Sequence, residues 1–218
     1  MRAFHTLALA VLGGAALLGC TTIAPSIVGS GTSATEQRSL PDFTELRVSH
    51  AIAVAVTIGS PTSVSVSADD NVLPRVKTTV AGGRLDIAIE GSVQVRTPVT
   101  LTVTVPSLTA LGATSAGRVT VTGLAADSLA VSTESAGVID VAGQATTLTI
   151  NAASSGVATL GQLAVGDVSV DIESVGRATI TPTGRVTGSV ESGGILVIEG
   201  SPAAVEVSTG SAGQVIRR

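Results

Sequence analysis

The sequence predicts an all-β protein whose C-terminal half coils as a solenoid behind a group of N-terminal strands. Three observations carry this prediction. Apolar and polar residues alternate with the period of two that is typical of β-strands. A Ser-x-Gly motif recurs six times at intervals of 18 to 20 residues. Aromatic residues make up only 1% of the chain, which favours a narrow interior filled by columns of small aliphatic side chains.

Residues 1–19 are typical of a secretory signal peptide and are set aside before the fold is considered. Arg2 precedes an apolar run over residues 7–18, which is too short for a transmembrane helix. The run Leu17-Leu18-Gly19-Cys20 resembles the lipobox of bacterial lipoproteins, in which a peptidase cuts before a Cys whose sulfur carries a diacylglycerol. Cys20 is the only Cys of the chain, so we expect it to be the lipidation site.

Residues 20–40 are expected to contain the lipidated Cys and a flexible tether. The stretch from Thr21 to about Gln37 is rich in Ser, Thr, Gly and Ala and shows neither the strand period nor the helical period. A flexible chain of this length has a root-mean-square reach of about 20–25 Å. The folded domain, predicted over residues 41–218, would therefore stand clear of the lipid headgroups.

Residues 41–105 show the strand alternation most clearly. Apolar side chains at every second position predict a strand over residues 46–58, another around residues 64–66 and a last one over residues 99–105. Ala81-Gly82-Gly83 predicts a hairpin turn. Asp69-Asp70-Asn71 is expected to form a turn or to cap a short helical turn, because it lacks the spacing and the Gly of an EF-hand calcium loop.

Residues 106–218 hold the Ser-x-Gly repeat, and each repeat is predicted to be strand, corner, strand. Apolar residues stand eight and six positions before most of the glycines, and two and four positions after most of them. We expect each Gly either to adopt a positive φ or to allow a close backbone approach, and the Ser hydroxyls to hydrogen-bond along a column. The predicted structural corners are Ser115 and Gly117, Ser135 and Gly137, Ser154 and Gly156, Ser174 and Gly176, Ser192 and Gly194, and Ser211 and Gly213.

An antiparallel sandwich with a turn every ten residues would have strands of similar length. A solenoid requires every corner to turn in the same way, whereas a sandwich does not, so the recurring Ser and Gly favour the solenoid. One coil of about twenty residues buries too few aliphatic side chains to fold alone, so stacking is obligatory. Arg217 takes an aliphatic position in the last repeat, and we expect its charge and that of Arg218 to oppose end-to-end growth into bactofilin-like filaments.

Several short motifs follow one another along the chain: Phe43-Thr44-Glu45-Leu46-Arg47-Val48 leading into Ile52-Ala53-Val54-Ala55-Val56, then Ala68-Asp69-Asp70-Asn71-Val72-Leu73, Gly83-Arg84-Leu85-Asp86-Ile87 and Val105-Pro106-Ser107-Leu108. Their order resembles the head GIN domain family, whose members are labelled autotransporter adhesins. The resemblance spans nearly the whole chain after Cys20. It implies a right-handed parallel β-helix, in which the six repeats would form about six C-terminal rungs of 18–20 residues. It also indicates adhesion and brings no catalytic residues with it.

Few side chains are available for chemistry. His50 is the only His after the signal peptide, and its alternating neighbours predict a solvent-facing strand position, while Lys77 is the only Lys. No base stands at motif spacing from the corner serines, so we assign no catalytic residue, no cofactor and no metal ligand. A net charge of −4 and the lack of Tyr and Trp argue against a nucleic-acid partner.

Acidic residues follow the repeat on its outer face. Glu134, Glu173 and Glu191 each stand three positions before a repeat Gly. We favour a solvated acidic strip over a cation site, because a flat strand face offers few of the six to eight oxygen ligands that calcium takes.

The sequence therefore predicts a non-catalytic envelope lipoprotein, exported by its signal peptide and held in the membrane through the lipid on Cys20. Its coil would face the periplasm or the outside and bind an envelope or extracellular protein or a glycan. The alternative is a carbohydrate-active β-helix enzyme acting on polysaccharide, which requires two or more carboxylates beside a basic groove.

Overall fold

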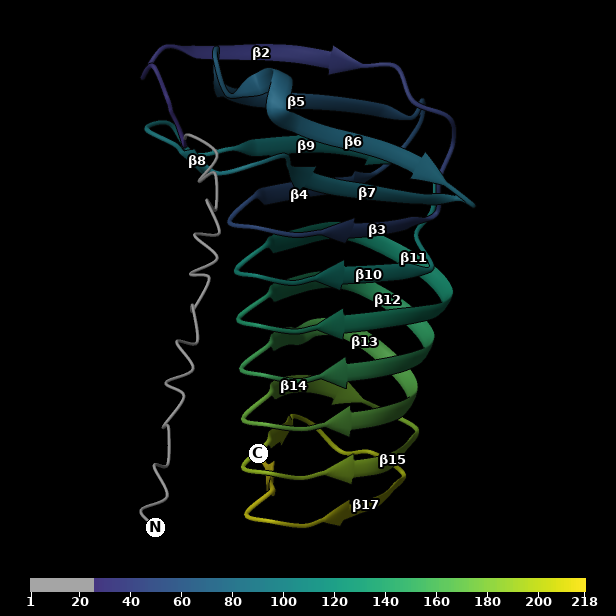
Figure 1. Cartoon of the computed structure of the whole chain (residues 1–218). Helices are drawn as coiled ribbons and strands as arrows, with labels where there is room; N and C mark the ends of the chain where they lie inside the picture. The colour runs from purple at the N-terminus through teal and green to yellow at the C-terminus, as the bar shows by residue number, and fades with distance from the viewer. Residues whose placement is uncertain (1–25) are drawn as a thin grey trace, which may run out of the picture.

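The structure is a computed structural model that describes residues 26–218. Every regular element in this range is a strand except one short 3-10 helix. The strands form two regions (Figure 1): the coil, residues 45–58 and 110–217, and the cap, residues 26–40 and 59–105. All of them belong to one continuous sheet except the two short strands over residues 27–28 and 93–94, which pair only with each other. The coil is a stack of parallel strands, whereas the cap contains antiparallel pairs.

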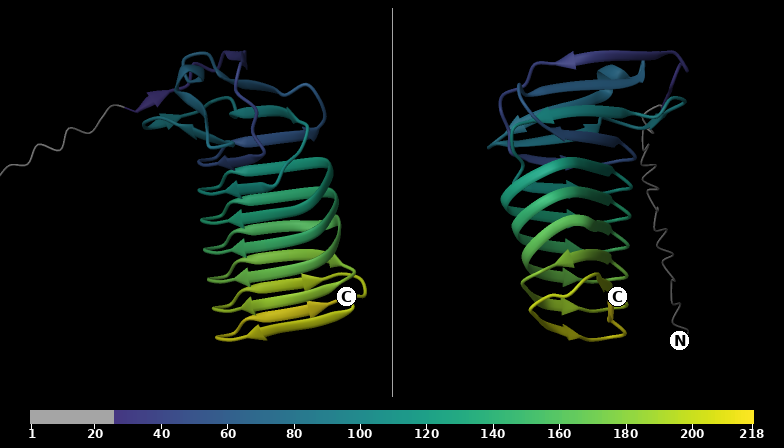
Figure 2. Two further views of the ribbon diagram at one scale, coloured as in Figure 1. Left: turned by 90° about the vertical axis from the view of Figure 1, so that its right-hand side faces the viewer. Right: turned by 180° about the vertical axis from the view of Figure 1, so that it is seen from behind.

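Each turn of the coil carries one strand before a corner and one after it. Strands of successive turns pair in parallel, so that Leu111 lies beside Val131 and Val131 beside Ile150. The winding is right-handed (Figures 1 and 2), which confirms the predicted fold class, and it makes about five turns where about six rungs were predicted. The coil strands are β3 (Glu45–Val48), β4 (Ala53–Ile58), β10 (Ala110–Ala113), β11 (Arg118–Thr133), β12 (Val138–Ala152), β13 (Val157–Ile172), β14 (Arg177–Pro182), β15 (Arg185–Val190), β16 (Ile195–Ile198), β17 (Ala204–Thr209) and β18 (Gln214–Arg217).

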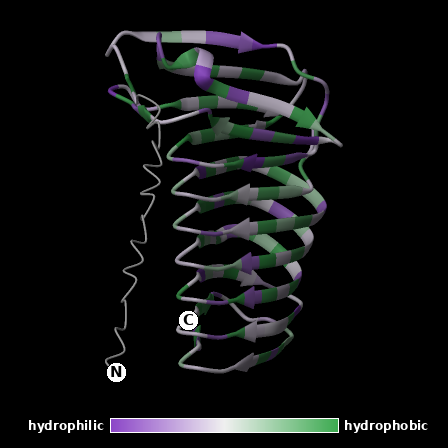
Figure 3. Cartoon of the chain, in the orientation of Figure 1, coloured by the Kyte–Doolittle hydropathy of each residue, from purple (hydrophilic) through white to green (hydrophobic). Residues whose placement is uncertain are grey.

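The interior of the coil consists of aliphatic columns, one residue from each turn. Side chains alternate in and out along every strand, and Figure 3 shows this as alternating apolar and polar bands. Most of the positions predicted from the repeat are buried, including Leu148, Ile150, Ala158 and Leu160. In the last repeat, Val205, Val207 and Val215 are only half-buried. The predicted core of the coil is therefore confirmed.

The cap closes the end of the coil at the top of Figure 1. β5 pairs antiparallel with both β2 and β9, and β6 and β7 form the predicted hairpin around Gly82 and Gly83. Because β7 also pairs with β3 and β9 with β4, both in parallel, the cap continues the coil sheet. The cap elements are β1 (Ile27–Val28), β2 (Ser33–Arg38), β5 (Ser63–Asp69), η1 (Leu73–Arg75), β6 (Val76–Ala81), β7 (Arg84–Ile89), β8 (Val93–Gln94) and β9 (Thr100–Val105).

The predicted tether over residues 20–40 is wrong for its second half. β1 and β2 occupy most of residues 27–38, and β2 pairs with β5 from Ser33 opposite Asp69 to Arg38 opposite Val64. Backbone hydrogen bonds at a sheet edge hold this strand, and its mostly polar side chains give no hydropathy signal. Residues 1–19 and Cys20 lie outside the described residues, so the signal peptide and the lipidation site stay predictions.

The predicted strand over residues 46–58 is two strands that form the first turn of the coil. The chain turns between β3 and β4 at His50, whose φ is 65°. β3 and β4 then pair with β10 and β11, as in the later turns. The alternation continues across this corner because Val48 and Ile52, four residues apart, both point inward. His50 is exposed as predicted, but it lies at a corner and not in a strand.

All six Ser-x-Gly corners form, but the left-handed conformation does not fall on the final Gly. The corner Ser residues have φ between 45° and 52°, and the residue after each Ser has φ between 64° and 77°. The N–H of the Gly then closes the turn on the carbonyl three residues earlier, as between Gly156 and Ala153 at 2.8 Å. One residue strains this pattern: Val175 is β-branched and 64% exposed, yet adopts a φ of 66°.

The corner Gly is needed because backbones approach closely. A Cβ on Gly156 would overlap the carbonyl of Thr133 in the preceding turn, and one on Gly176 would overlap that of Ala152. In the first turn, Ile52 occupies the position that a corner Gly takes in the later turns. No Ser-x-Gly corner precedes this first turn. Of the two predicted roles for the Gly, close approach is confirmed and positive φ is wrong.

The corners stack through backbone groups. After each of the first five corner Ser residues, the N–H of the next residue donates to the Ser carbonyl of the following turn, as from Val175 to Ser192 at 3.1 Å and from Gly193 to Ser211 at 3.0 Å. Within residues 26–218 the six corner Ser hydroxyls make no hydrogen bond to another protein group. The predicted ladder of Ser hydroxyls is therefore wrong, since the carbonyls already satisfy the stacked corner.

Candidate binding surface

The groups nearest to a catalytic arrangement lie at the first corner. The Ser49 hydroxyl is 3.0 Å from Nδ1 of His50. It also lies 3.2 Å from the carbonyl of Ile87, to which it donates. A nucleophile must give its proton to the base and needs a third group to orient that base. In the described part of the chain no carboxylate bonds to His50, and the corner serines are not brought near it by any hydrogen bond.

A shallow groove of about 530 Å³ follows the strand face just after the corners. Four outward side chains of successive turns lie side by side along it: Thr120, Asp140, Thr159 and Thr179. Equivalent residues of neighbouring parallel strands are about 4.8 Å apart. The groove therefore presents a regular row of hydroxyls interrupted by one carboxylate, and we call it the threonine groove.

The two charged groups of the threonine groove are in different situations. Asp140 pairs with Arg118 at 2.9 Å, and both side chains remain partly exposed. Glu199 is half-buried and makes no salt bridge with any residue from 26 to 218. Its Oε2 lies 2.9 Å from the position that a Cβ on Gly161 would take, so the lack of a side chain at Gly161 leaves room for the Glu199 carboxylate in the groove.

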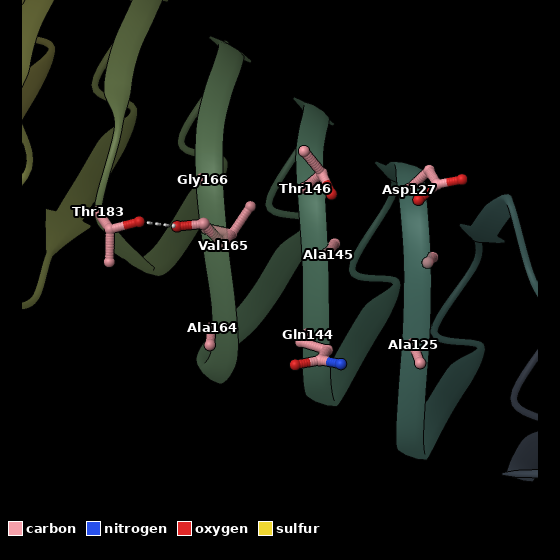
Figure 4. Close-up of a pocket in the computed structure, with 10 residues that line it drawn as sticks. Ala125, Asp127, Gln144, Ala145, Thr146, Ala164, Val165, Gly166 and Thr183 are labelled. Atoms are coloured by element: carbon pink, nitrogen blue, oxygen red, sulfur yellow. Dashed lines mark hydrogen bonds between the residues drawn. The ribbon is translucent and has the colours of Figure 1, made fainter.

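A second groove, of about 590 Å³, lies on the bend where the long strands pass from one face to the next. Figure 4 shows that Ala125, Ala164 and Gly166 leave it lined by small side chains. Asp127, Gln144 and Thr146 provide its polar edge. The Thr183 hydroxyl donates to the carbonyl of Val165 at 3.1 Å, so this hydroxyl is already used by the fold. The second groove therefore combines small side chains with three polar side chains at its edge.

The predicted acidic strip is on the surface. Glu134, Glu173 and Glu191 are all exposed and begin the turns at their corners. Asp171 beside them accepts a hydrogen bond from the Ser189 hydroxyl at 2.9 Å. No group of three or more His, Cys, Asp or Glu side chains in residues 26–218 is arranged to hold a metal ion.

The Asp69-Asp70-Asn71 motif builds the cap. The predicted short helical turn forms as η1, but Val72 is its N-cap residue and no side chain caps it. The fully buried Asp69 carboxylate instead accepts backbone N–H groups of Gly31, Arg96 and Thr97 at 3.0, 2.8 and 3.2 Å. Burial raises the pKa of Asp69, but these bonds and one from the Thr97 side chain outweigh it and hold the pKa below its usual 3.8.

The residues of the threonine groove were not singled out from the sequence. Each stands three positions after a corner Gly, so one signal for them was present in the repeat itself. This spacing of three residues identifies a side chain that points outward, but it does not show that the surface forms a groove there. The groove exists because Gly161 and Ala142 are small where neighbouring turns carry longer side chains, and only the stacking of turns brings these residues together.

No helix within residues 26–218 has the length and apolar character to span a membrane. Fold and surface together define a right-handed parallel β-helix that presents flat, grooved faces and holds its own backbone rigidly. Residues 42–202 match the family described as "Putative auto-transporter adhesin, head GIN domain", and the chain belongs to this family. The resemblance inferred from the sequence motifs is thereby confirmed.

Solved structures share the fold at low sequence identity. A "putative adhesin" from Bacteroides fragilis has a TM-score of 0.71 and 19% identity, over 88% of this chain and all of that one. A "putative adhesin" from Parabacteroides merdae has a TM-score of 0.58 and 18% identity, over 89% and 100%. A "Putative lipid binding protein" from Parabacteroides distasonis has a TM-score of 0.50 and 18% identity over the same shares. No curated protein sequence matches the chain.

Proposed function

We propose that the protein is a non-catalytic envelope lipoprotein, anchored through a lipid on Cys20, whose coil displays a binding surface for an envelope or extracellular protein or glycan. Membership of an adhesin family supports a binding role at the cell surface. The observation that carries the proposal is the threonine groove, where a rigid backbone presents hydroxyls at regular spacing.

The groove suits a ligand with repeating hydroxyl or amide groups, such as an extended glycan or peptide. Thr120, Thr159 and Thr179 each provide a donor and an acceptor. Because parallel strands fix these hydroxyls, binding requires little additional ordering of the protein. Asp140 is engaged by Arg118 and is open to water, unlike the buried carboxylic acid of a glycosidase. These features support binding and not hydrolysis of the ligand.

The test measures retention of the purified, lipidated full-length protein on immobilised peptidoglycan, on a glycan panel and on extracellular matrix proteins. The variant Gly161→Arg fills the floor of the groove, and Ala130→Arg adds the same charge on an exposed strand position elsewhere. We expect Gly161→Arg to reduce retention about tenfold or more, because its side chain would block the contacts between the ligand and the groove, and a few contacts provide most of the binding energy. Ala130→Arg should bind like the unmodified protein.

Two results would contradict the proposal. Release of sugar fragments from a glycan by the unmodified protein would identify an enzyme. Equal retention of the Gly161→Arg and unmodified proteins on the ligand that binds best would place the binding surface away from the threonine groove.

A further inference from the structure

β1 and β8 form a two-stranded parallel ribbon that is separate from the main sheet. The left view of Figure 2 shows this ribbon standing out sideways from the column of turns, at the level of the cap. The N–H groups of Ile27 and Gly29 donate to the carbonyls of Ser92 and Gln94 at 2.9 and 2.7 Å. The ribbon is therefore an ordered projection from the coil and cap.

The ribbon and its flank carry exposed large hydrophobic side chains. Three large hydrophobic residues in residues 26–218 are exposed, and two of them, Val28 at 48% and Val95 at 43%, lie in or beside the ribbon. Arg96 follows Val95, is exposed and makes no ion pair with another residue of 26–218. Two apolar side chains beside a free guanidinium match the boundary between acyl chains and phosphate headgroups.

The ribbon is held in place by the buried Asp69 and by Asn71. The Asp69 carboxylate accepts hydrogen bonds from the backbone N–H of Gly31, which follows β1, and from that of Arg96, which follows β8. The Asn71 side chain donates to the carbonyl of Val28 at 2.8 Å. These bonds already order the ribbon in the free protein. Binding of the ribbon to a surface therefore costs little additional conformational entropy.

The distance to the predicted anchor limits where the ribbon can be. Six residue steps separate Cys20 from Ser26, and a fully extended chain covers about 3.3–3.6 Å per residue, or about 20 Å in total. A lipid on Cys20 would therefore keep the ribbon within about 20 Å of the membrane. At this range even a weak contact is favoured, because the tether raises the effective concentration of the two surfaces.

We propose that the β1–β8 ribbon rests on the membrane that holds the Cys20 lipid, with Val28 and Val95 at the acyl boundary and Arg96 at a lipid phosphate. This inference rests on the proposed lipid anchor. As a consequence, the cap would contact the bilayer directly. This contact, and not a flexible tether alone, would fix the orientation of the coil relative to the membrane.

The test uses single Trp reporters, since the chain contains no Trp. Lipidated full-length Val95→Trp is reconstituted into phosphatidylethanolamine and phosphatidylglycerol vesicles with or without brominated acyl chains. Gln144→Trp is the matched control, because Gln144 is exposed and lines the second groove of the coil (Figure 4), away from the residues of the ribbon. We expect bromolipid to quench the indole of Val95→Trp strongly and that of Gln144→Trp little.

Flotation of the same vesicles separates this inference from the anchor. Adding Val28→Asp to the Val95→Trp protein should reduce quenching and leave flotation unchanged. Equal quenching of both reporters in floating vesicles would overturn the ribbon contact and leave the anchor standing. Failure of the unmodified protein to float would overturn both. Val28→Trp is a second reporter should Val95→Trp fold poorly, as judged by its thermal melting.

Discussion

The coil and the cap bury similar aliphatic residues but are held together in different ways. In the coil, each turn repeats the same corner, and the corner glycines and backbone carbonyls of neighbouring turns stack on one another. In the cap, no element repeats, and particular side chains such as Asp69 and Asn71 join segments far apart in the chain. The stability of a coil position therefore depends on the neighbouring turns, whereas that of the cap depends on individual hydrogen bonds.

The largest effect is expected from Gly156→Val in a central corner. The new side chain overlaps the carbonyl of Thr133, and turns on both sides prevent the chain from moving away. Overpacking of this kind costs about 3 kcal/mol in the free energy of unfolding. Gly213→Val makes the same overlap with Val190 in the last described turn, which can separate at a cost of about 1 kcal/mol. Urea denaturation measures both, and equal midpoints would show that corners do not act through stacking.

An intermediate and local effect is expected from Asp69→Asn in the cap. The amide replaces an acceptor oxygen by a donor that faces backbone N–H groups, so the segments around Gly31 and Arg96 should loosen. Hydrogen exchange at these amides should rise about tenfold or more, while coil amides keep their protection. Asp70→Asn, at the exposed neighbour, is the control. Unchanged exchange in Asp69→Asn would mean that the carboxylate does not hold the cap.

The same carboxylate makes the cap sensitive to acid. The native pKa of Asp69 is lowered, so its charged form contributes stability that is complete above the unfolded pKa, close to 3.8. This contribution is lost as pH falls below 3.8 and through the lower native pKa. Thermal melting between pH 5 and pH 2.5 should show this loss in the unmodified protein and not in Asp69→Asn. A parallel loss in both proteins would assign the acid sensitivity to other groups.

The smallest effect is a gain in stability from Thr133→Val in the coil. The Thr133 hydroxyl is buried and has no hydrogen-bond partner among the described residues. Val has nearly the same shape, so the substitution removes an unsatisfied polar group and leaves no cavity. We expect about 1 kcal/mol of added stability in urea denaturation. Thr159→Val, at an exposed outward position, should change stability by less than about 0.5 kcal/mol. Destabilisation by Thr133→Val would indicate that its hydroxyl has a partner, such as bound water.

The coil could be predicted from the sequence because its geometry repeats. The recurring Ser and Gly mark the corners, and the apolar offsets around each Gly mark the interior columns that the structure shows. The role of the Ser could not be predicted: its φ near 50° comes from the turn that the stacked carbonyls require, and its hydroxyl contributes no hydrogen bond to the column.

The cap was predicted less well because its polar residues act over long sequence distances. β2 has no apolar period, since its strand conformation comes from pairing with β5. Asp69 is read from the sequence as a turn residue, yet its three N–H donors come from residues 27 to 38 positions away. The threonine groove was missed for a similar reason, because its Thr, Asp and Gly residues meet only when turns stack.

The sequence by itself determined the strand period, the six corners and the aliphatic interior, and through them the solenoid class. These features are local or repeat at a constant interval, so the sequence of each turn gives the same structural information as that of the neighbouring turns. Only the tertiary structure decided which residue of each corner is left-handed, that the chain from Ile27 belongs to the cap, and where the surface is hollowed. These features depend on contacts between segments that are far apart in the sequence and are not related by the repeat. At each such contact, the close approach of backbones, the burial of side chains and the hydrogen bonds together determine the local structure.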